Sequence, residues 1–394
     1  MKSTLHTTRL TLAEPLRISR AVMDARDAVW LSVEHGGARG HGEAVASVYY
    51  GLDADTLGRL LREAAVELAR FAEPESALAA SRDGALLPHD TPPAVRAAVD
   101  SALLDLVGKR AGTPVHHLLG AQAPPAAATA RTIGITSPVR AALRARCLAD
   151  SGFTVIKIKG GSPDPADDLA RVRAVREGAP HARLLLDPNG AWTTAEAKRL
   201  LPRFAELGVE AVEQPTAPGD PEALARLART SPLPIVADED AVGLDDARRL
   251  AGRVHGVNVK LAKCGGPHAA LRIAEALAGS GTDLMLGCLT ASSLGIAPAV
   301  HLADRARWVD LDGHLLLAHD PWQGIGGSDG TVRAADRAGL GVRRAEPAPE
   351  PAPEPAPEPA PEPAPEPGAT STTGPPAPGI PGPSKETPHR AHVA

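Results

Sequence analysis

Two lysines, Lys157 and Lys159, stand one residue apart in the stretch FTVIKIKGG, directly before two glycines. Side chains alternate along a strand, so both lysines point to one face with Val155, while Ile156 and Ile158 point to the other. In a packed sheet the two ammonium groups would lie together at the carboxyl end of the strand, where like charges lower lysine pKa values. The alternative is an edge strand whose lysines stand in solvent and block aggregation.

Other apolar runs along the chain end in the same way. The runs RLLLDP, VEAVEQP, LPIVADE, GVNVKLAK, TDLMLGC and WVDLDG each reach an ionisable residue or a tight glycine turn. Most of these ends are about 25 residues apart, the length of one strand–helix unit, since eight units make about 250 residues. The positions are Lys159, Asp187, Glu213, Asp238, Lys260, Gly287–Cys288 and Asp310. Their succession predicts one shared site at the mouth of a parallel barrel.

Three carboxylates, from Asp187, Glu213 and Asp238, fall on successive strands of this pattern. They cannot all stay ionised in one place without a cation. A set of oxygen ligands with no histidine or cysteine nearby favours a hard ion, and we predict Mg²⁺. The alternative is a carboxylate cluster that Lys159 and Lys260, on the flanking strands, neutralise.

Lys159 and Lys260 lie on either side of the acid trio, a placement suited to opposite faces of one bound carbon. A carbon next to a carboxylate is a very weak acid, and a metal on that carboxylate offsets the charge formed when the proton leaves. We predict that Lys159 and Lys260 are the acid/base pair and that Lys157 is a fixed cation, and that the metal and Lys157 depress the pKa values of the pair. The expected reaction is a 1,1-proton transfer, racemisation or epimerisation.

The elements that must position these residues follow from the rhythm of the chain. From about residue 130 to 325, short apolar runs alternate with amphipathic helices, which predicts a parallel sheet. A doubly wound sheet gathers its special residues at one switch point, whereas a closed barrel takes them from many strand ends, as here. Residues 1–50 predict a strand meander and residues 53–120 predict helices, which together form an α+β unit.

The composition narrows the class of protein. Of 394 residues, 43% are hydrophobic and 2% aromatic, and the net charge is −5 without a basic block, which argues against a nucleic-acid partner. Three scattered cysteines (Cys147, Cys264 and Cys288) give no disulfide framework and fit a cytoplasmic location. The chain shows no signal peptide and no apolar run of the about eighteen residues that would predict a membrane span.

From residue 346 the chain changes to an EPAP repeat and then to a Gly/Pro/Ser/Thr-rich stretch. Such a sequence forms no core and is expected to be extended polyproline II followed by flexible coil. The predicted domain limits are therefore 1–125 for an α+β capping domain, 126–325 for the barrel, 326–345 for a segment returning to the cap, and 346–394 for the tail.

The motifs KIK, LLLDPNGAW, VEQP, VADED and VNVKLAKCGG together resemble the enolase superfamily in its muconate-lactonising subgroup. The resemblance covers about residues 8–325 and includes GHGEA, SVYYG and AVDSALLDLVGKRAG in the cap. It implies a modified TIM barrel, (β/α)₇β, with an N-terminal α+β capping domain. It also implies Mg²⁺ ligation by Asp187, Glu213 and Asp238, and a lysine pair formed by Lys159 and Lys260.

Within the subgroup, the WVDLDG stretch resembles the dipeptide epimerases, in which such a D-x-D holds the free α-ammonium of the substrate. Asp310 and Asp312 alternate on one strand face, beside a part of the pocket expected to lack a cation. In the epimerases of Ala-Glu an arginine of the first cap loop binds the glutamate side chain, and an ungapped comparison places Met23 there, with Arg20 and Arg26 as other candidates. We therefore expect a dipeptide with an apolar or uncharged second residue, bound also by Thr132.

Several alternatives stay open at the level of sequence. A cycloisomerase, an o-succinylbenzoate synthase or an N-acylamino acid racemase would use the same barrel site, but their substrates lack the ammonium that Asp310 and Asp312 suit. A Schiff-base aldolase would need one lysine and would leave the acid trio unexplained. A binding protein whose active feature is the Pro/Glu tail would not depend on Lys260. A homo-oligomer is also possible.

Overall fold

The computed structural model describes residues 1–346 and Gly374. Residues 1–346 belong to one compact unit, so the domain limits within it remain predictions. The predicted polyproline II tail lies outside the described residues, apart from Glu346 and Gly374. Within the described part, no helix has the length and apolar character needed to cross a membrane.

The N-terminal part is an antiparallel sheet covered by helices, and the predicted meander is confirmed. The strands pair in the order β1 (Lys2–Ile18), β2 (Ala21–His35) and β3 (Ala38–Val45). The helices are α1 (Ala54–Ala69), α2 (Pro74–Arg82), α3 (Pro93–Ala111) and the short α4 (Val115–Leu118). Strand β3 lies so close to α3 that a Cβ on Gly42 would stand 2.0 Å from the carbonyl oxygen of Ala98. This contact explains the second glycine of the GHGEA motif.

The central part is a nearly closed barrel of eight parallel strands, as predicted. The strands are neighbours in chain order, and their bounds are β5 (Ala130–Ile133), β6 (Val155–Lys159), β7 (Arg183–Asp187), β8 (Val209–Glu213), β9 (Ile235–Ala237), β10 (Gly256–Lys260), β11 (Asp283–Gly287) and β12 (Trp308–Asp310). The ends of β12 and β5 are joined by hydrogen bonds from backbone N–H groups to side-chain oxygens. Thr129 Oγ1 accepts from Leu311 N at 2.9 Å, and Asp312 Oδ2 accepts from Thr132 N at 2.7 Å.

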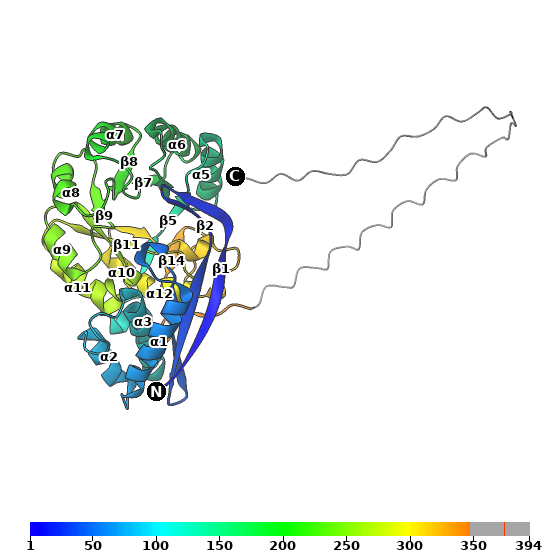
Figure 1. Cartoon of the computed structure of the whole chain (residues 1–394), viewed down its shortest axis with the longest axis vertical. Coiled ribbons are helices and arrows are strands. Elements are labelled where there is room, and N and C mark those ends of the chain that lie inside the picture. Colours follow the sequence, from blue (N-terminus) through cyan, green and yellow to red (C-terminus); the bar gives the residue numbers. More distant parts are fainter. Residues whose placement is uncertain (347–373, 375–394) are drawn as a thin grey trace, which may run out of the picture. The chain divides into compact units, whose positions relative to one another are not determined.

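Helices follow the first seven barrel strands and cover the outside of the barrel (Figure 1). They are α5 (Pro138–Asp150), α6 (Pro165–Gly178), α7 (Thr194–Glu206), α8 (Pro221–Ala228), α9 (Leu244–Leu250), α10 (Leu261–Cys264) with α11 (Pro267–Leu277), and α12 (Ser293–Val300). The last strand, β12, is followed by a 3₁₀ turn, Gly313–Leu316. The (β/α)₇β architecture is therefore confirmed.

The strands sort their side chains as the alternation predicts. Ile156 and Ile158 are fully buried in the large core that includes the surrounding helices. The other face fills the inside of the barrel with a small apolar cluster, which consists of Ala130, Val155, Leu185, Ala211, Val236, Met285 and Trp308. Lys157 follows Val155 on this inner face, so the strand pattern directs the lysines into the barrel.

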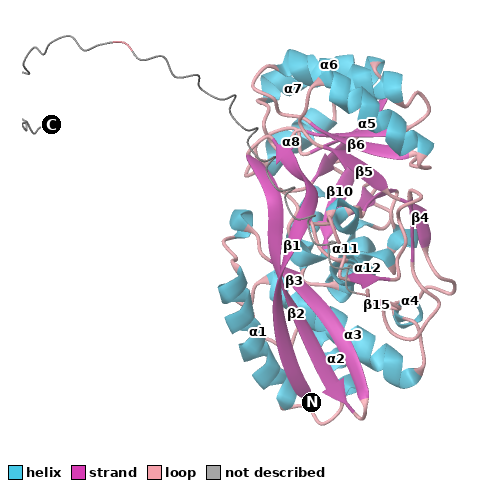
Figure 2. Ribbon diagram, turned by 90° about the vertical axis from the view of Figure 1, so that its right-hand side faces the viewer, coloured by secondary structure: helices cyan, strands magenta, loops and turns pink. Residues whose placement is uncertain are grey.

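The cap reaches the barrel through the long β1–β2 hairpin, which runs from the cap helices to the region of α5 and α6 (Figures 1 and 2). The carbonyl of Arg17 accepts from Ile135 N at 2.8 Å, after strand β5. At Gly161, after β6, a Cβ would lie 2.8 Å from the Cβ of Ser19, and the backbone has φ of +83°. The second glycine of KIKGG is therefore required by the hairpin tip as well as by its own conformation.

Candidate active site

The predicted residues meet at the carboxyl ends of the barrel strands. Strands β6, β7, β8, β10 and β12 end on the expected residue, and β9 ends at Ala237, one residue before Asp238. All of the predicted acids are buried, with exposures of 5% or less for Asp187, Glu213, Asp238, Asp310 and Asp312. Burying so many carboxylates in one place requires compensating positive charge.

Lys157 stands at the centre of this group. Its Nζ lies 2.6 Å from Glu213 Oε2, 2.7 Å from Asp310 Oδ2 and 3.1 Å from Asp187 Oδ2. Burial alone would lower the pKa of Lys157, but the three carboxylates outweigh burial and hold it well above its ordinary value. Lys157 is therefore a permanent cation in this arrangement, which is what its predicted role requires.

Lys159 and Lys260 flank the central lysine. Lys159 Nζ lies 2.6 Å from Asp187 Oδ2, and Lys260 Nζ lies 2.8 Å from Asp238 Oδ2. Their strands, β6 and β10, are four steps apart in the eight-stranded order, which is half of the circumference. The two ammonium groups thus approach the mouth from opposite walls of the barrel.

The predicted depression of the lysine pKa values depends on a bound metal and stays a prediction, whereas the protein groups alone shift the pKa of Lys260 upward. Burial and the charge of Lys157 do lower its pKa, but Asp238 and Glu213 act more strongly and raise it above the ordinary value. A nearby lysine has the opposite effect on an acid, because its positive charge lowers the pKa of the carboxyl group. Burial raises the pKa of Asp187, yet Lys159 and Lys157 outweigh burial and lower it. Glu213 is different, because burial and the charge of Asp187 raise its pKa to about 7.

Three residues that the sequence analysis did not select hold the acids in place. Lys263, on α10, is buried and donates to Asp238 Oδ1 at 2.5 Å, and also to the carbonyls of Asp238, Ala241 and Asn258. Asn258 Nδ2 donates to Glu213 Oε1 at 2.7 Å. Gln214 Oε1 accepts from the backbone N of Asp238 at 2.9 Å. Asn258 lies two residues before Lys260 on the same strand face, so strand alternation alone could have placed it in the site. Lys263 lies beyond the strand, where alternation predicts nothing.

Glycine at the end of β11 makes room for this arrangement. A Cβ on Gly287 would stand 2.5 Å from Asn258 Oδ1 and 2.8 Å from its Nδ2. Any side chain there would displace Asn258 and, through it, Glu213. The neighbouring Cys288 is largely buried, and burial raises the pKa of its thiol, so it is a packing residue.

Asp310 and Asp312 do not lie beside a cation-free part of the pocket, and this part of the prediction is corrected. Strand β12 ends at Asp310, which binds Lys157, and the chain then turns, so that Asp312 accepts from Thr132 N at 2.7 Å and from Arg131 Nη1 at 3.3 Å. Thr132 therefore contacts Asp312 through its backbone. Asp310 Oδ1 is buried and has no hydrogen-bond partner within the described part of the chain.

In the region of the first cap loop, Arg20 lies in the turn between β1 and β2, whereas Met23 and Arg26 lie on β2. Arg20 Nη2 lies 2.9 Å from Glu239 Oε1, just after β9, and its guanidinium stacks on the ring of Tyr49 at 4.7 Å. Arg26 donates to the carbonyl of Ala46 and to Met23 Sδ, the latter at 3.2 Å. Met23 is half-buried opposite Leu16 in the hairpin. Arg20 is therefore paired with an acid, whereas Arg26 is held by the Ala46 carbonyl and by the Met23 thioether.

The donor chemistry of the acid trio fits a magnesium ion. Asp187, Glu213 and Asp238 offer only carboxylate oxygens from consecutive strands, which suits a hard cation. Burial and, after it, the charge of Asp187 raise the pKa of Glu213, so this carboxylate would gain from a nearby cation. The ligand oxygens of the trio do not all lie within 4.8 Å of one another, because among the described residues only His116, His117 and Asp336 meet that spacing. Each carboxylate of the trio contacts a lysine instead.

Comparison with known families places this chain by sequence and fold. The N-terminal domain model of the mandelate racemase/muconate lactonizing enzymes matches residues 2–120, and the enolase C-terminal domain-like model matches residues 139–348. The chain belongs to the enolase superfamily, among its dipeptide epimerases. This enzyme is therefore an isomerase, and the aldolase alternative is excluded.

Several relatives of this enzyme match over nearly their whole length. A hydrophobic dipeptide epimerase of Roseobacter litoralis is 35% identical over 353 residues, covering 86% of this chain and 98% of the relative. An L-Ala-D/L-Glu epimerase of Bacteroides thetaiotaomicron is 30% identical over 349 residues, covering 87% and 88%. The crystal structure of a dipeptide epimerase from Enterococcus faecalis, complexed with Mg and L-Leu-L-Tyr, aligns with a TM-score of 0.80 at 29% identity and covers 86% of this chain and 98% of its own.

Proposed function

We propose that this enzyme inverts the α-carbon of the C-terminal residue of an L,L-dipeptide by two-base proton transfer. The observation that supports this most is the placement of Lys159 and Lys260 on opposite walls of one mouth, four strands apart. A base on each side of a planar intermediate allows removal of the proton from one face and its return to the other. One lysine on one face would return the proton with retention.

The roles of the other residues follow from their contacts. Asp187, Glu213 and Asp238 would hold Mg²⁺, which would offset the charge developing on the substrate carboxylate. Lys157, a cation between three acids, fixes positive charge beside the same carboxylate. Asp310 offers the unpartnered Oδ1 to the substrate α-ammonium. Lys263 and Asn258 position Asp238 and Glu213 rather than contacting the substrate.

We propose a second residue that is apolar or uncharged. The β1–β2 hairpin supports this preference because Arg20 is paired with Glu239, Arg26 donates to the Ala46 carbonyl, and Met23 contributes an apolar thioether. Similarity to the hydrophobic dipeptide epimerase and to the enzyme that binds L-Leu-L-Tyr points the same way. The cytoplasm is the proposed compartment, since Cys147, Cys264 and Cys288 are all free thiols.

The test is deuterium exchange. The full chain is incubated in D₂O with Mg²⁺ and a mixed set of L,L-dipeptides, and the mass of each dipeptide is followed. We expect one deuterium at the α-carbon of the C-terminal residue, together with its epimer, and the apolar dipeptides should exchange first. If no dipeptide exchanges while Mg²⁺ is shown to bind, the proposal is overturned and N-acylamino acids become the next substrates to assay.

Lysine variants then separate the two faces. Lys159→Met and Lys260→Met should each abolish epimerisation, yet each should retain exchange from one of the two epimers and lose it from the other. Lys198→Met is the matched control, because Lys198 is exposed on α7, outside the barrel mouth. Exchange of both epimers in either variant would contradict the two-base assignment.

A further inference from the structure

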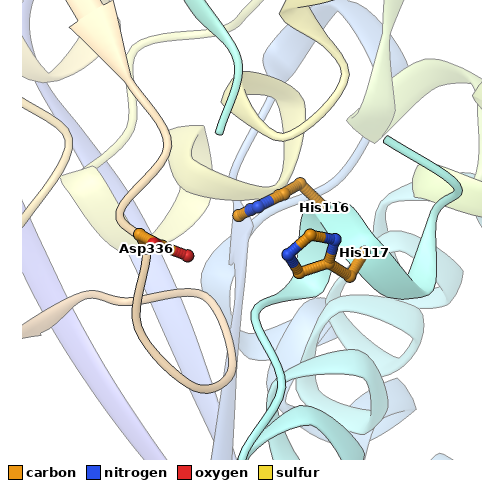
Figure 3. A group of neighbouring side chains, drawn as sticks. All are labelled: His116, His117 and Asp336. Atoms are coloured by element: carbon orange, nitrogen blue, oxygen red, sulfur yellow. The ribbon is translucent and has the colours of Figure 1, made fainter. Parts of the chain in front are cut away.

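Two histidines and an aspartate gather away from the barrel mouth. His116 and His117 belong to α4, and Asp336 follows strand β14 (Thr331–Arg333). One ligand atom of each lies within 4.8 Å of the other two. Figure 3 shows the His116 ring and the Asp336 carboxylate pointing toward each other, with the His117 ring beside them.

His116 differs from most buried polar residues because its ring nitrogens lack hydrogen-bond partners among the described residues. The side chain is fully buried, and neither Nδ1 nor Nε2 has a hydrogen-bond partner in the described part of the chain. Its ring stacks on His301 at 5.6 Å, but Nε2 of His301 bonds to the carbonyl of Leu340. Buried polar groups normally find partners, and an imidazole with two unpartnered nitrogens needs an explanation.

His117 is prepared as a metal ligand. Its Nδ1 lies 3.0 Å from the carbonyl oxygen of Ala121, which can accept only if Nδ1 carries the proton. That hydrogen bond fixes the tautomer and leaves Nε2 with a free lone pair, the arrangement usual for histidine ligands. Asp336 is exposed.

We propose that His116, His117 and Asp336 form a second metal site, which binds Zn²⁺ and is separate from the barrel mouth. Two imidazoles and one carboxylate suit zinc, with water as the fourth ligand, whereas the oxygen-only trio of the mouth suits Mg²⁺. The chain therefore offers each ion a different donor set.

The site would join two distant segments. The segment after Asp336 already lies along α4, since Val115 N donates to the carbonyl of Gly339 at 2.9 Å and Gly339 N donates to the carbonyl of Thr113 at 3.0 Å. A zinc ion shared by α4 and Asp336 would add a cross-link between the cap and the C-terminal segment. The role is structural, because none of the three residues contacts the lysines or acids of the mouth.

The test is a Zn²⁺ titration of the untagged full chain in excess Mg²⁺, against a chromophoric chelator. We expect one tight equivalent, a rise in Tm of about 2–5 °C, and, with Co²⁺ in place of Zn²⁺, the visible bands of a four-coordinate ion. His117→Ala and Asp336→Asn should each weaken binding by about tenfold or more and abolish the Tm rise, without altering epimerisation.

Two controls address other histidines. His181→Ala removes an exposed histidine from the loop before β7, and the double variant His389→Ala, His392→Ala removes the histidines near the chain end. Both should bind Zn²⁺ like the unaltered chain. The proposal is overturned if Zn²⁺ does not bind, if binding survives in His117→Ala and Asp336→Asn, or if the double variant abolishes it.

Discussion

The barrel mouth and the contact between cap and barrel both bury carboxylates, but they treat the charge differently. At the mouth, Asp187 and Asp238 face lysines, which outweigh burial and lower the pKa of each acid. At the cap contact, Glu43 of β3 meets only neutral donors, namely Trp30 Nε1 at 2.6 Å, Ser292 N at 2.9 Å and Ser292 Oγ. Burial is then the largest influence, and the pKa of Glu43 rises to about 7.

The difference in pKa between these acids matches a difference in role, since the acids of the mouth belong to the proposed reaction and Glu43 joins the cap to the barrel. The charges of Asp187 and Asp238 are costly to bury, and they are retained where a substrate carboxylate, an ammonium and a moving proton need them. A carboxyl whose neighbours are neutral can take up a proton instead, and it then serves as a hydrogen-bonding link between β3 and α12. The predictions that follow test whether the two regions depend on their acids in these different ways.

The largest effect is expected from Asp187→Asn. The substitution removes one proposed Mg²⁺ ligand and leaves Lys159 without its carboxylate. Activity should fall on the order of 10³-fold or more, with a clear loss of Mg²⁺ affinity. Exchange assays and calorimetric Mg²⁺ titration measure the two effects. Asp167→Asn, at an exposed helix start, is the control and should change neither. Normal Mg²⁺ binding in Asp187→Asn would contradict the ligand assignment.

Lys263→Met tests whether buried ion pairs at the mouth also hold the fold. Lys263 is 2% exposed and is bonded to Asp238 Oδ1 and to three carbonyls, which would all lose a donor. Urea unfolding should show a loss of about 3–5 kcal/mol. Lys109→Met is the matched variant in the cap, since Lys109 pairs with buried Asp105 at 2.7 Å but is itself partly exposed. Equal losses of unfolding free energy in the two variants would show that the ion pair at the mouth stabilises the fold no more than the ion pair in the cap does.

Glu43→Gln tests the cap contact through pH. The folded-state pKa of about 7 lies above the unfolded value of 4.5, so the folded protein binds more protons between these values. The unfolding free energy therefore falls as pH rises through this window, by about 3 kcal/mol from Glu43. The difference between the unaltered chain and Glu43→Gln in urea unfolding should show this slope from pH 4.5 to 7. Parallel stability curves for the two proteins would show that Glu43 stays ionised.

The barrel and its strand-end residues were predictable because the information is local. Alternation placed Val155 and Lys157 on one face, and the repeat of strand and helix placed Asp187 and Glu213 at successive ends. What lies beyond a strand end was not predictable in this way. Lys263 reaches Asp238 from a short helix, and Asp312 turns toward Thr132 after β12 stops.

Charge balance was the second limit of the sequence. The sequence places Lys260 near the acid trio but does not show how closely Asp238 and Glu213 approach it, and these two carboxylates raise its pKa when the protein groups act alone. The sequence also did not reveal contacts between distant residues. Nothing near His116 and His117 in the sequence indicates that Asp336 lies beside them. Such contacts depend on the whole fold rather than on spacing.

The smallest effect is expected from Met23→Arg, which changes the cap and leaves the mouth intact. If the mouth sets the reaction and the cap sets the substrate, the variant should keep its exchange rate per bound substrate but shift its preference by about tenfold toward a C-terminal glutamate, because the new guanidinium can pair with that carboxylate. Competition between L-Ala-L-Glu and L-Leu-L-Tyr in one D₂O reaction measures the ratio of kcat/KM values. Val22→Arg, at an exposed neighbouring position, is the control and should leave the ratio unchanged. If both variants shift it equally, the effect is general electrostatic attraction and Met23 does not line the substrate pocket.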